Sequence, residues 1–320
     1  MRHLFLISAL TLGAFTITVP TPVNAEAAVT SRYVINGNGV RLRAEPNISS
    51  AELDKLSLGT SVTPLQKTTK PSTVNGNTGY WYQIKTDKAT GWIFGSFLTP
   101  ATDNVNTTLE LLRGKLKAEN LSFEDAVAAY KLADNALPQA KSRNDKGELE
   151  LDKLLALQHS YDSMPADKIH QSPYVDWYKK YGSISFGDDP SGQYLVSTKP
   201  FWALADQYKN DTIGDEIAWR ASQQRLGGEC EGMIGCASIA SQRTDGEYLK
   251  RYPKGRYVKP ALANVTDNFK YMLQEWNKPE QDASDANLKE WAVILSPQAN
   301  NPNAKKALGY LKQMQGMTKK

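Results

Sequence analysis

Residues 39–46 read Gly39-Val40-Arg41-Leu42-Arg43-Ala44-Glu45-Pro46. Successive side chains of a β-strand point to opposite faces, so this alternation places Val40 and Leu42 on one face and the two arginines on the other. Proline lacks a backbone N–H donor and ends the strand. The pattern predicts the first strand of a small β-barrel with one apolar face.

Three further runs continue the pattern. Residues 56–65 contain a strand, a turn at Gly59 and a second strand, since glycine tolerates positive φ. Residues 80–85 and 90–98 are rich in aromatic and β-branched residues and are separated by a short turn, which is typical of a β-hairpin. We therefore expect a barrel over residues 32–99.

The order of these elements resembles the bacterial SH3 domain family. The shared outline is a valine-and-arginine strand that ends at proline, a Leu-x-x-Gly-Thr-x-Val hairpin at residues 56–62, a Trp-Tyr-x-Ile strand at 81–84 and a closing Gly-Trp-Ile at 91–93. Two departures are Arg41-Leu42-Arg43 in the first strand and a long loop at residues 67–78. The resemblance implies a barrel that holds an exported protein on cell-wall material.

The large side chains of the barrel divide between core and surface. We expect some of four large side chains to fill the core: Trp81, Trp92, Ile93 and Phe97. The other rings would point outward and form a shallow ligand groove with two arginines: Arg41, Arg43, Tyr80, Tyr82 and Phe94. Rings stack on sugar or peptide faces, and guanidinium groups pair with peptide carboxylates. The alternative is that these outward rings have no ligand.

Residues 1–25 have the features of a cleavable signal peptide. Arg2 and His3 form a positive start, residues 4–19 are largely apolar, and Val23-Asn24-Ala25 is a small-x-small cleavage site. We expect cleavage near Ala25 and a periplasmic or secreted protein. An apolar run this short is a poor membrane span, and no later run is apolar enough to be one.

The charge of the chain is nearly balanced, with a formal net charge of +4 at pH 7. Nucleic-acid-binding domains usually carry a clustered basic face, and lysine and arginine are scattered here, so we expect no nucleic-acid partner. The 320 residues exceed one small barrel several-fold, which requires a second domain with its own core. The predicted fold class is therefore multi-domain.

The second domain is predicted to be an all-α domain of helical hairpins over residues 106–316, because the apolar period changes there to about 3.6. Ser122 and Asp125 suggest a helix start at Phe123, and Thr198 caps a later helix with Pro200 in its first turn. The predicted helices cover residues 108–116, 123–137, 148–164, 198–208, 216–226, 237–251, 258–276 and 304–314. We expect an ordered aromatic loop with one short strand pair at residues 173–192.

One junction in this domain is similar to those of periplasmic tetratricopeptide-type proteins. In residues 246–261 a helix ends at Tyr252-Pro253, and a small-residue turn begins the next helix. No second copy lies at a period near 34 residues. An irregular helical bundle is the alternative to repeat-like stacking.

Residues for catalysis are few. His159 and His170 have no neighbours at metal-ligand spacing, so we expect no metal and no cofactor. Cys230 and Cys236 are expected to form a disulfide in an exported chain. The remaining candidates are carboxylates, which more simply cap turns or face water: Asp188, Asp189, Glu229 and Glu231.

These observations predict an exported binding protein that is not an enzyme, and we expect no catalytic residue. The leading hypothesis is attachment to peptidoglycan through the barrel. The alternative is an envelope protein as partner, with the helical domain acting as a periplasmic adaptor or inhibitor. An unrecognised hydrolase is the third possibility.

Overall fold

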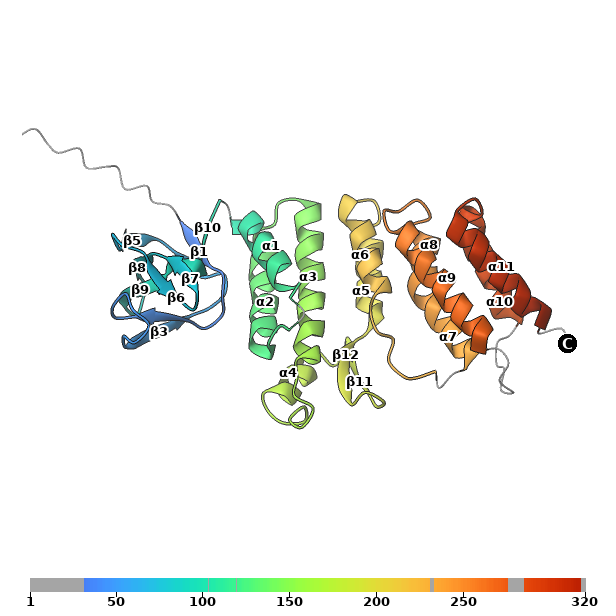
Figure 1. Ribbon diagram of the computed structural model, residues 1–320, viewed down its shortest axis with the longest axis horizontal. Helices are drawn as coiled ribbons and strands as arrows, with labels where there is room; N and C mark the ends of the chain where they lie inside the picture. Colours follow the sequence, from blue (N-terminus) through green and yellow to red (C-terminus); the bar gives the residue numbers. More distant parts are fainter. Residues whose placement is uncertain (1–31, 103, 119, 231–232, 276–284, 318–320) are drawn as a thin grey trace, which may run out of the picture.

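The computed structural model describes residues 32–102, 104–118, 120–230, 233–275 and 285–317. A β-barrel lies at one end, and the helices follow it in chain order, side by side, toward the C-terminus (Figure 1). This arrangement confirms the predicted fold class. The signal peptide expected at residues 1–25 lies outside the described residues.

Ten strands form the barrel and its hairpins within residues 33–100: β1 Tyr33–Ile35, β2 Val40–Arg43, β3 Glu52–Leu56, β4 Ser61–Val62, β5 Pro64–Lys67, β6 Ser72–Val74, β7 Asn77–Gly79, β8 Trp81–Lys85, β9 Thr90–Phe94 and β10 Leu98–Pro100. One sheet has the order β3-β2-β9-β8-β5 and another β10-β1-β4, while β6 and β7 pair only with each other. The two larger sheets enclose an apolar core: Ile35, Val40, Leu42, Leu56, Val62, Ile84, Ile93 and Leu98.

The predicted strand alternation and hairpin are confirmed. Val40 and Leu42 are buried while Arg41 is exposed, because only one face of β2 meets the core. Strands β8 and β9 pair in antiparallel register from Trp81 opposite Phe94 to Lys85 opposite Thr90. Gly59 has a φ of +80°, as its place in a tight turn requires.

The long loop expected at residues 67–78 contains the β6–β7 hairpin. Val74 pairs with Asn77, and the residues between them, Asn75 and Gly76, both have positive φ. An Asn-Gly pair suits a two-residue turn whose twist matches the flanking strands. Residues expected to be irregular therefore form an additional β-ribbon on the barrel.

Eleven α-helices lie in the described residues: α1 Asn104–Lys115, α2 Phe123–Ala136, α3 Arg143–Asp162, α4 Tyr174–Lys180, α5 Thr198–Gln207, α6 Thr212–Ser222, α7 Ile234–Ser241, α8 Glu247–Arg251, α9 Val258–Glu275, α10 Asp285–Leu295 and α11 Pro302–Met317. A hairpin of β11 Ser185–Asp188 and β12 Gln193–Val196 interrupts them. A π-helix over Gln242–Gly246 joins α7 to α8.

Several helix starts differ from the predictions. The start of α2 is as expected, with Ser122 Oγ accepting the N–H of Asp125 at 3.1 Å. Helix α3 begins five residues early, because Ser142 caps it by accepting the N–H of Asp145. Ser197, rather than Thr198, caps α5. The predicted loop at 173–192 holds a short helix, α4, besides its expected strand pair.

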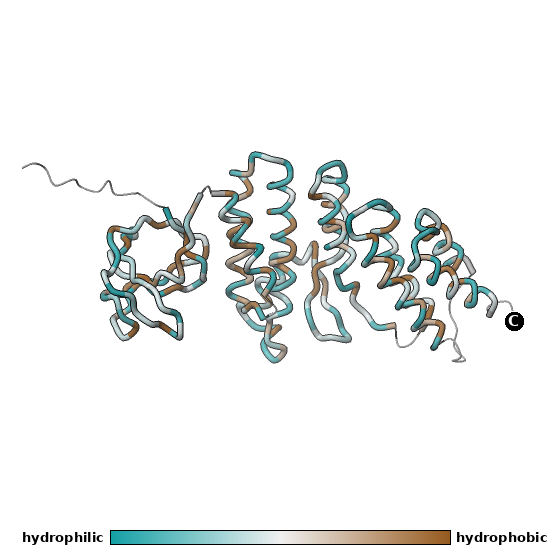
Figure 2. Tube along the Cα trace, turned by 45° about the horizontal axis from the view of Figure 1, so that its top comes forward, coloured by the Kyte–Doolittle hydropathy of each residue, from teal (hydrophilic) through white to brown (hydrophobic). Residues whose placement is uncertain are grey.

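Helix α10 was missed entirely. Its buried residues Leu288, Trp291 and Ile294 recur at a helical spacing, and Trp291 donates an indole N–H to Ser238 Oγ at 3.0 Å. The Phe269 ring of α9 packs edge-on against Trp291 at 4.9 Å. These contacts belong to one apolar core that continues from α3 to α11 (Figure 2, where brown segments face one another between helices).

The barrel packs directly on the helical domain. Leu58, in the turn before β4, is buried in a cluster with residues of α1, α2 and α3, among them Leu112 and Ala133. Gly59 lies against Leu132 of α2, and Asn38 Nδ2 donates to the carbonyl of Glu124 at 3.4 Å. The same turn therefore closes the barrel and contacts the helices.

The junction at Tyr252-Pro253 lies between α8 and α9, as expected. Whether the helices form true repeats stays a prediction. Cys230 and Cys236 are bonded, with an Sγ–Sγ distance of 2.08 Å. No helix in the described residues is long and apolar enough to cross a membrane.

Candidate binding face of the barrel

The two arginines of the predicted groove lie on the outer face of β2. Arg41 is exposed, and its Nε is 3.1 Å from Glu52 Oε2 on the neighbouring β3. Arg43 is partly buried, and its Nη1 donates to the carbonyl of Ser50 at 2.8 Å. Both guanidinium groups are thus anchored and keep other N–H donors.

The two tyrosines do not share this face. Tyr80 precedes β8, is 36% exposed and has Lys67 Nζ 5.0 Å from its ring centroid. Tyr82 is partly buried and packs against the barrel core, with its ring 6.0 Å from that of Tyr33. The expectation that Tyr82 points outward is wrong, because it lies on the same side of β8 as the core residue Ile84.

Phe94 also differs from the prediction, since it is 2% exposed. It does lie on the outer side of β9, opposite Trp81, whose ring packs edge-on against it at 5.5 Å. Gly79 of β7 lies against the Phe94 ring, since a Cβ at this position would come within 3.2 Å of Phe94 Cζ. The β6–β7 hairpin therefore lies over Phe94 and removes it from any open groove.

Trp92 and Phe97 also differ from the prediction. Trp92 was expected in the core, but Ile93 occupies the inward position of β9, so Trp92 lies on the outer face and is only partly buried. Phe97 is 38% exposed. Of the four core candidates, Trp81 and Ile93 are buried, and Trp81 packs against Phe94 rather than in the cluster between the two sheets.

The structure brings together a different set of polar and aromatic residues. Gln66 pairs with Gln83, Gln83 lies opposite Trp92, and Trp92 lies opposite Arg43 across four adjacent strands. Residues directly opposite one another in antiparallel strands share a face. Gln66 Nε2 donates to Gln83 Oε1 at 2.8 Å. We call this line of side chains the Trp92 row: Gln66, Gln83, Trp92 and Arg43.

The Trp92 row has the chemistry of a shallow binding surface. A partly buried indole offers a rigid apolar face and an N–H, and the amides and guanidinium beside it add hydrogen-bond donors and acceptors. At one end of the row Arg43 is followed by Glu52 on β3. Leu42, Ile84 and Ile93 face the core, so alternation along each strand places their neighbours Arg43, Gln83 and Trp92 on the outer face. This alternation is the sequence signal that could have identified the row.

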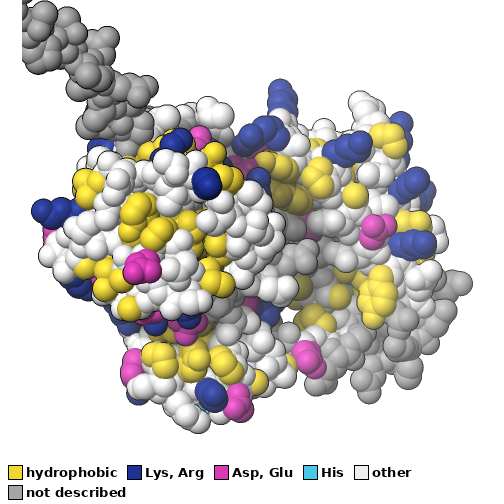
Figure 3. Space-filling model, turned by 60° about the vertical axis from the view of Figure 1, so that its left-hand side comes forward, with side chains coloured by type: hydrophobic (Ala, Val, Ile, Leu, Met, Phe, Trp, Pro, Cys, Tyr) yellow, Lys and Arg dark blue, Asp and Glu magenta, His cyan; other side chains and the backbone are white. Residues whose placement is uncertain are grey.

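Exposed apolar side chains add to the surface of the barrel: Ile48, Leu53, Leu65, Tyr80 and Phe97. Figure 3 shows hydrophobic side chains gathered on the barrel face that the view brings forward, with lysine and arginine at its edge.

Asp54 of β3 accepts the backbone N–H of Lys55 at 2.9 Å and Lys88 Nζ at 3.2 Å. Both hydrogen bonds lower the pKa of the Asp54 carboxyl and keep it ionised.

The candidate catalytic groups are not assembled into a site in the described residues. His170 Nδ1 is 3.2 Å from the hydroxyl of Tyr194, and His159 lies on α3. Asp188 accepts the N–H of Gly228 at 2.7 Å and the hydroxyl of Ser191. Glu231 lies outside the described residues. No group of three or more His, Cys, Asp or Glu in the described part of the chain could hold a metal ion.

Comparison with protein families matches residues 38–99 to the family described as bacterial SH3 domain. The match confirms the resemblance seen in the sequence and extends over strands β2 to β9. Comparisons with curated proteins and with solved structures gave no match for the chain.

Proposed function

We propose that this protein acts outside the cytoplasm as a non-catalytic binding protein that attaches to peptidoglycan through its bacterial SH3 domain. The observation that carries this proposal is the family match over residues 38–99, combined with an open row of binding-type side chains on the same domain. Family membership alone would leave the binding face unspecified. We assign the binding face to the Trp92 row.

The Trp92 row suits the two chemical components of peptidoglycan. The CH faces of a sugar ring can pack on the partly exposed indole of Trp92, while hydroxyl and amide groups bond to Gln66 and Gln83. Arg43 has N–H donors left for a peptide carboxylate after its bond to Ser50. A shallow face of this kind favours weak, repeated attachment to a polymer over tight binding of one molecule.

An extracytoplasmic location is supported by the residues themselves. The N-terminal segment has signal-peptide features, and Cys230 is bonded to Cys236, which suits an oxidising compartment. We propose that the protein is not catalytic, because His170 and Asp188 bond to neighbouring residues and His159 lies on α3 without joining them in a site. An assay for release of soluble fragments from cell walls tests that part directly.

Retention on purified sacculi tests the attachment. We expect the full chain to sediment with sacculi and Trp92→Ala to lose at least about two-thirds of the retained fraction, because truncating an aromatic anchor typically costs more than 1 kcal/mol. Tyr271→Ala is the matched control, since Tyr271 is an exposed ring on α9, far along the chain from the barrel.

Two results would count against the proposal. Retention of the unaltered chain no greater than that of an unrelated protein of similar charge would remove the peptidoglycan assignment, and an envelope protein would replace it as the partner. Equal retention of the Trp92→Ala and Tyr271→Ala variants would remove the Trp92 row from the binding face.

A further inference from the structure

A cleft of about 900 Å³ lies between α3 and α6, away from the barrel face described above. Helix α1 and the segment before α9 contribute to its walls. We call it the α3–α6 cleft. Its charged lining residues include Arg113, Glu148, Asp152, Glu216, Arg220 and Arg256.

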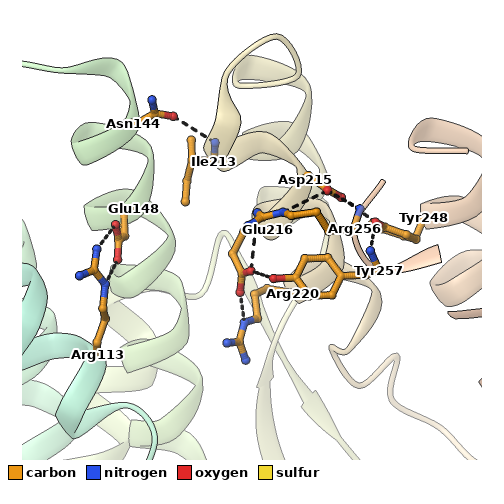
Figure 4. A network of polar contacts seen from close by, with 10 residues as sticks. All are labelled: Arg113, Asn144, Glu148, Ile213, Asp215, Glu216, Arg220, Tyr248, Arg256 and Tyr257. Atoms are coloured by element: carbon orange, nitrogen blue, oxygen red, sulfur yellow. Dashed lines mark hydrogen bonds and ion pairs between the residues drawn. The ribbon is translucent and has the colours of Figure 1, made fainter. Parts of the chain in front are cut away.

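One end of the cleft is closed by direct contact between the helices. Asn144 Oδ1 at the start of α3 accepts the backbone N–H of Ile213 in α6 at 3.0 Å. Gly147 of α3 lies against Ile213, since a Cβ at position 147 would come within 2.8 Å of Ile213 Cγ2. The separation of α3 and α6 is thus fixed at this end, and the cleft extends from it (Figure 4).

Ion pairs hold the charged groups of both walls in place. Arg113 of α1 makes two hydrogen bonds to Glu148, at 2.5 Å and 2.7 Å. On the opposite wall, Glu216 accepts Arg220 Nε at 2.8 Å and also the hydroxyl of Tyr257. These bonds make the positions of both arginines well defined.

The guanidinium of Arg220 keeps its terminal nitrogens available. Its hydrogen bond to Glu216 uses Nε, and Figure 4 shows the rest of the group extending from α6 toward the gap. Arg256, whose Nε is 3.4 Å from Asp215 Oδ2, adds a second positive charge to this wall. The α6 wall therefore presents N–H donors to the cleft.

Asp152 of α3 is the exception among these groups. It is 6% exposed, and its Oδ2 has no hydrogen-bond partner in the described residues. A buried acceptor without a partner is unfavourable, because its desolvation is not compensated. Burial and then the nearby Glu148 raise the pKa of Asp152 to about 7, while Arg113 and Arg220 oppose this shift.

We propose that the α3–α6 cleft binds a small zwitterionic ligand, an amino acid or short peptide, whose ammonium pairs with Asp152 and whose carboxylate pairs with Arg220. An ammonium beside Asp152 supplies the missing hydrogen bond and neutralises a charge that Glu148 otherwise destabilises. The terminal nitrogens of Arg220 match the planar geometry of a carboxylate.

The size and apolar lining of the cleft favour this class over an inorganic anion. Volumes of 300–1,000 Å³ are usual for small-molecule sites, and the cleft falls in this range. Leu151, Leu155 and Ile213 also line it and can contact ligand side chains. A phosphate ion would fill little of this space and would leave Asp152 facing another negative charge.

A series of alanine peptides tests the proposal without changing the protein. Alanine, dialanine and trialanine would be titrated calorimetrically into the full chain, since the series also measures the spacing between the two anchoring groups. For the best-bound length, N-acetylation and C-terminal amidation should each weaken binding by at least about tenfold, because each removes one charge-assisted contact. Inorganic phosphate is titrated as the control, because it would bind to a site that attracts any anion.

Two variants then assign the ends of the ligand. Asp152→Asn should lose the preference for the free ammonium, and Arg220→Gln should lose the preference for the free carboxylate, each leaving the other preference in place. Arg251→Gln is the matched control, because Arg251 is an ion-paired helix arginine outside the cleft. Circular dichroism of each variant reports whether it is folded.

A proton count gives an independent measurement. If an ammonium pairs with Asp152, the carboxyl must ionise, so binding near pH 6 should release protons, detected as different heats in buffers of different ionisation enthalpy. The groups that act on Asp152 are Glu148 of its own helix, Arg113 of α1 and Arg220 of α6.

Three results would overturn the proposal: no binding of any peptide at millimolar concentration, equal binding of free and blocked peptides, or binding of phosphate in preference to all of them. None of these bears on the Trp92 row, and loss of retention on sacculi would not affect the cleft.

Discussion

Trp81 and Phe94 lie directly opposite each other on β8 and β9, with their ring centroids 5.5 Å apart, and both are almost fully buried. They are on the outer face of the sheet, where Gly79 of the β6–β7 hairpin lies against Phe94. The β8–β9 hairpin thus has apolar packing on both of its faces. Trp92, two residues from Phe94 on the same face, remains partly exposed.

Trp81→Ala should destabilise the barrel by about 3–5 kcal/mol, because removing a buried tryptophan leaves a large cavity. Trp92→Ala should cost less than about 2 kcal/mol, since its ring is only partly buried. Hydrogen exchange of peptides from residues 38–99, followed by mass spectrometry in the full chain, measures the local free energy of unfolding. Equal losses for the two variants would contradict the assignment of Trp92 to the open face.

Much of the barrel was predictable because alternation along a strand identifies its buried face. Val40, Leu42 and Ile93 occupy the expected positions. The exposure of rings on the outer face was not predictable by the same rule. It depends on whether another segment covers them, and the covering hairpin is formed by residues 72–79, which the sequence presents as a polar loop.

The helical domain shows the same limit at a larger scale. A cap such as Ser122 is a local signal, so the start of α2 could be predicted. The signal for α10 is the helical spacing of the buried residues Leu288 and Trp291, which the sequence analysis did not use. The α3–α6 cleft could not be predicted at all. Arg113, Asp152 and Arg220 are brought together only by packing of three helices that are far apart in the chain.

Gly59→Ala should loosen the contact between the barrel and α2. Gly59 has a φ of +80°, and a Cβ there would come within 2.4 Å of Leu132 Cδ1. Gly39→Ala is the matched control, because Gly39 also has positive φ, at +66°, but open space around it. Both should lose about 1 kcal/mol from backbone strain.

Only Gly59→Ala should also speed hydrogen exchange in α2, residues 123–136, because only this substitution displaces Leu132. Equal exchange in α2 for the two variants would show that the barrel and the helical domain are not energetically coupled through this turn.

Replacing both cysteines by alanine should lower the free energy of unfolding of the helical domain by roughly 2 kcal/mol. Cys230 and Cys236 are six residues apart, and closing so short a loop removes little entropy from the unfolded chain. Urea denaturation of the full chain and the double variant measures the difference. Reduction of the unaltered protein should give the same loss, and a variant as stable as the oxidised protein would contradict this estimate.

Asp152→Asn should stabilise the protein in a pH-dependent way. The pKa of Asp152 is raised from 3.8 to about 7, chiefly by burial, so the folded state holds a proton that the unfolded state releases as the pH rises above about 4. Stability from this group is therefore complete below pH 4 and is lost as the pH rises to about 7. At 1.4 kcal/mol per pKa unit, the gain from the neutral amide should reach on the order of 2–4 kcal/mol at pH 8 and vanish at pH 4. Urea denaturation at pH 4, 6 and 8 measures this gain.

Asp245→Asn is a useful comparison, because burial raises the pKa of Asp245 only to about 6, so its gain should be smaller and should level off at lower pH. A gain for Asp152→Asn that does not change with pH would mean that the carboxyl is not held neutral in the folded protein.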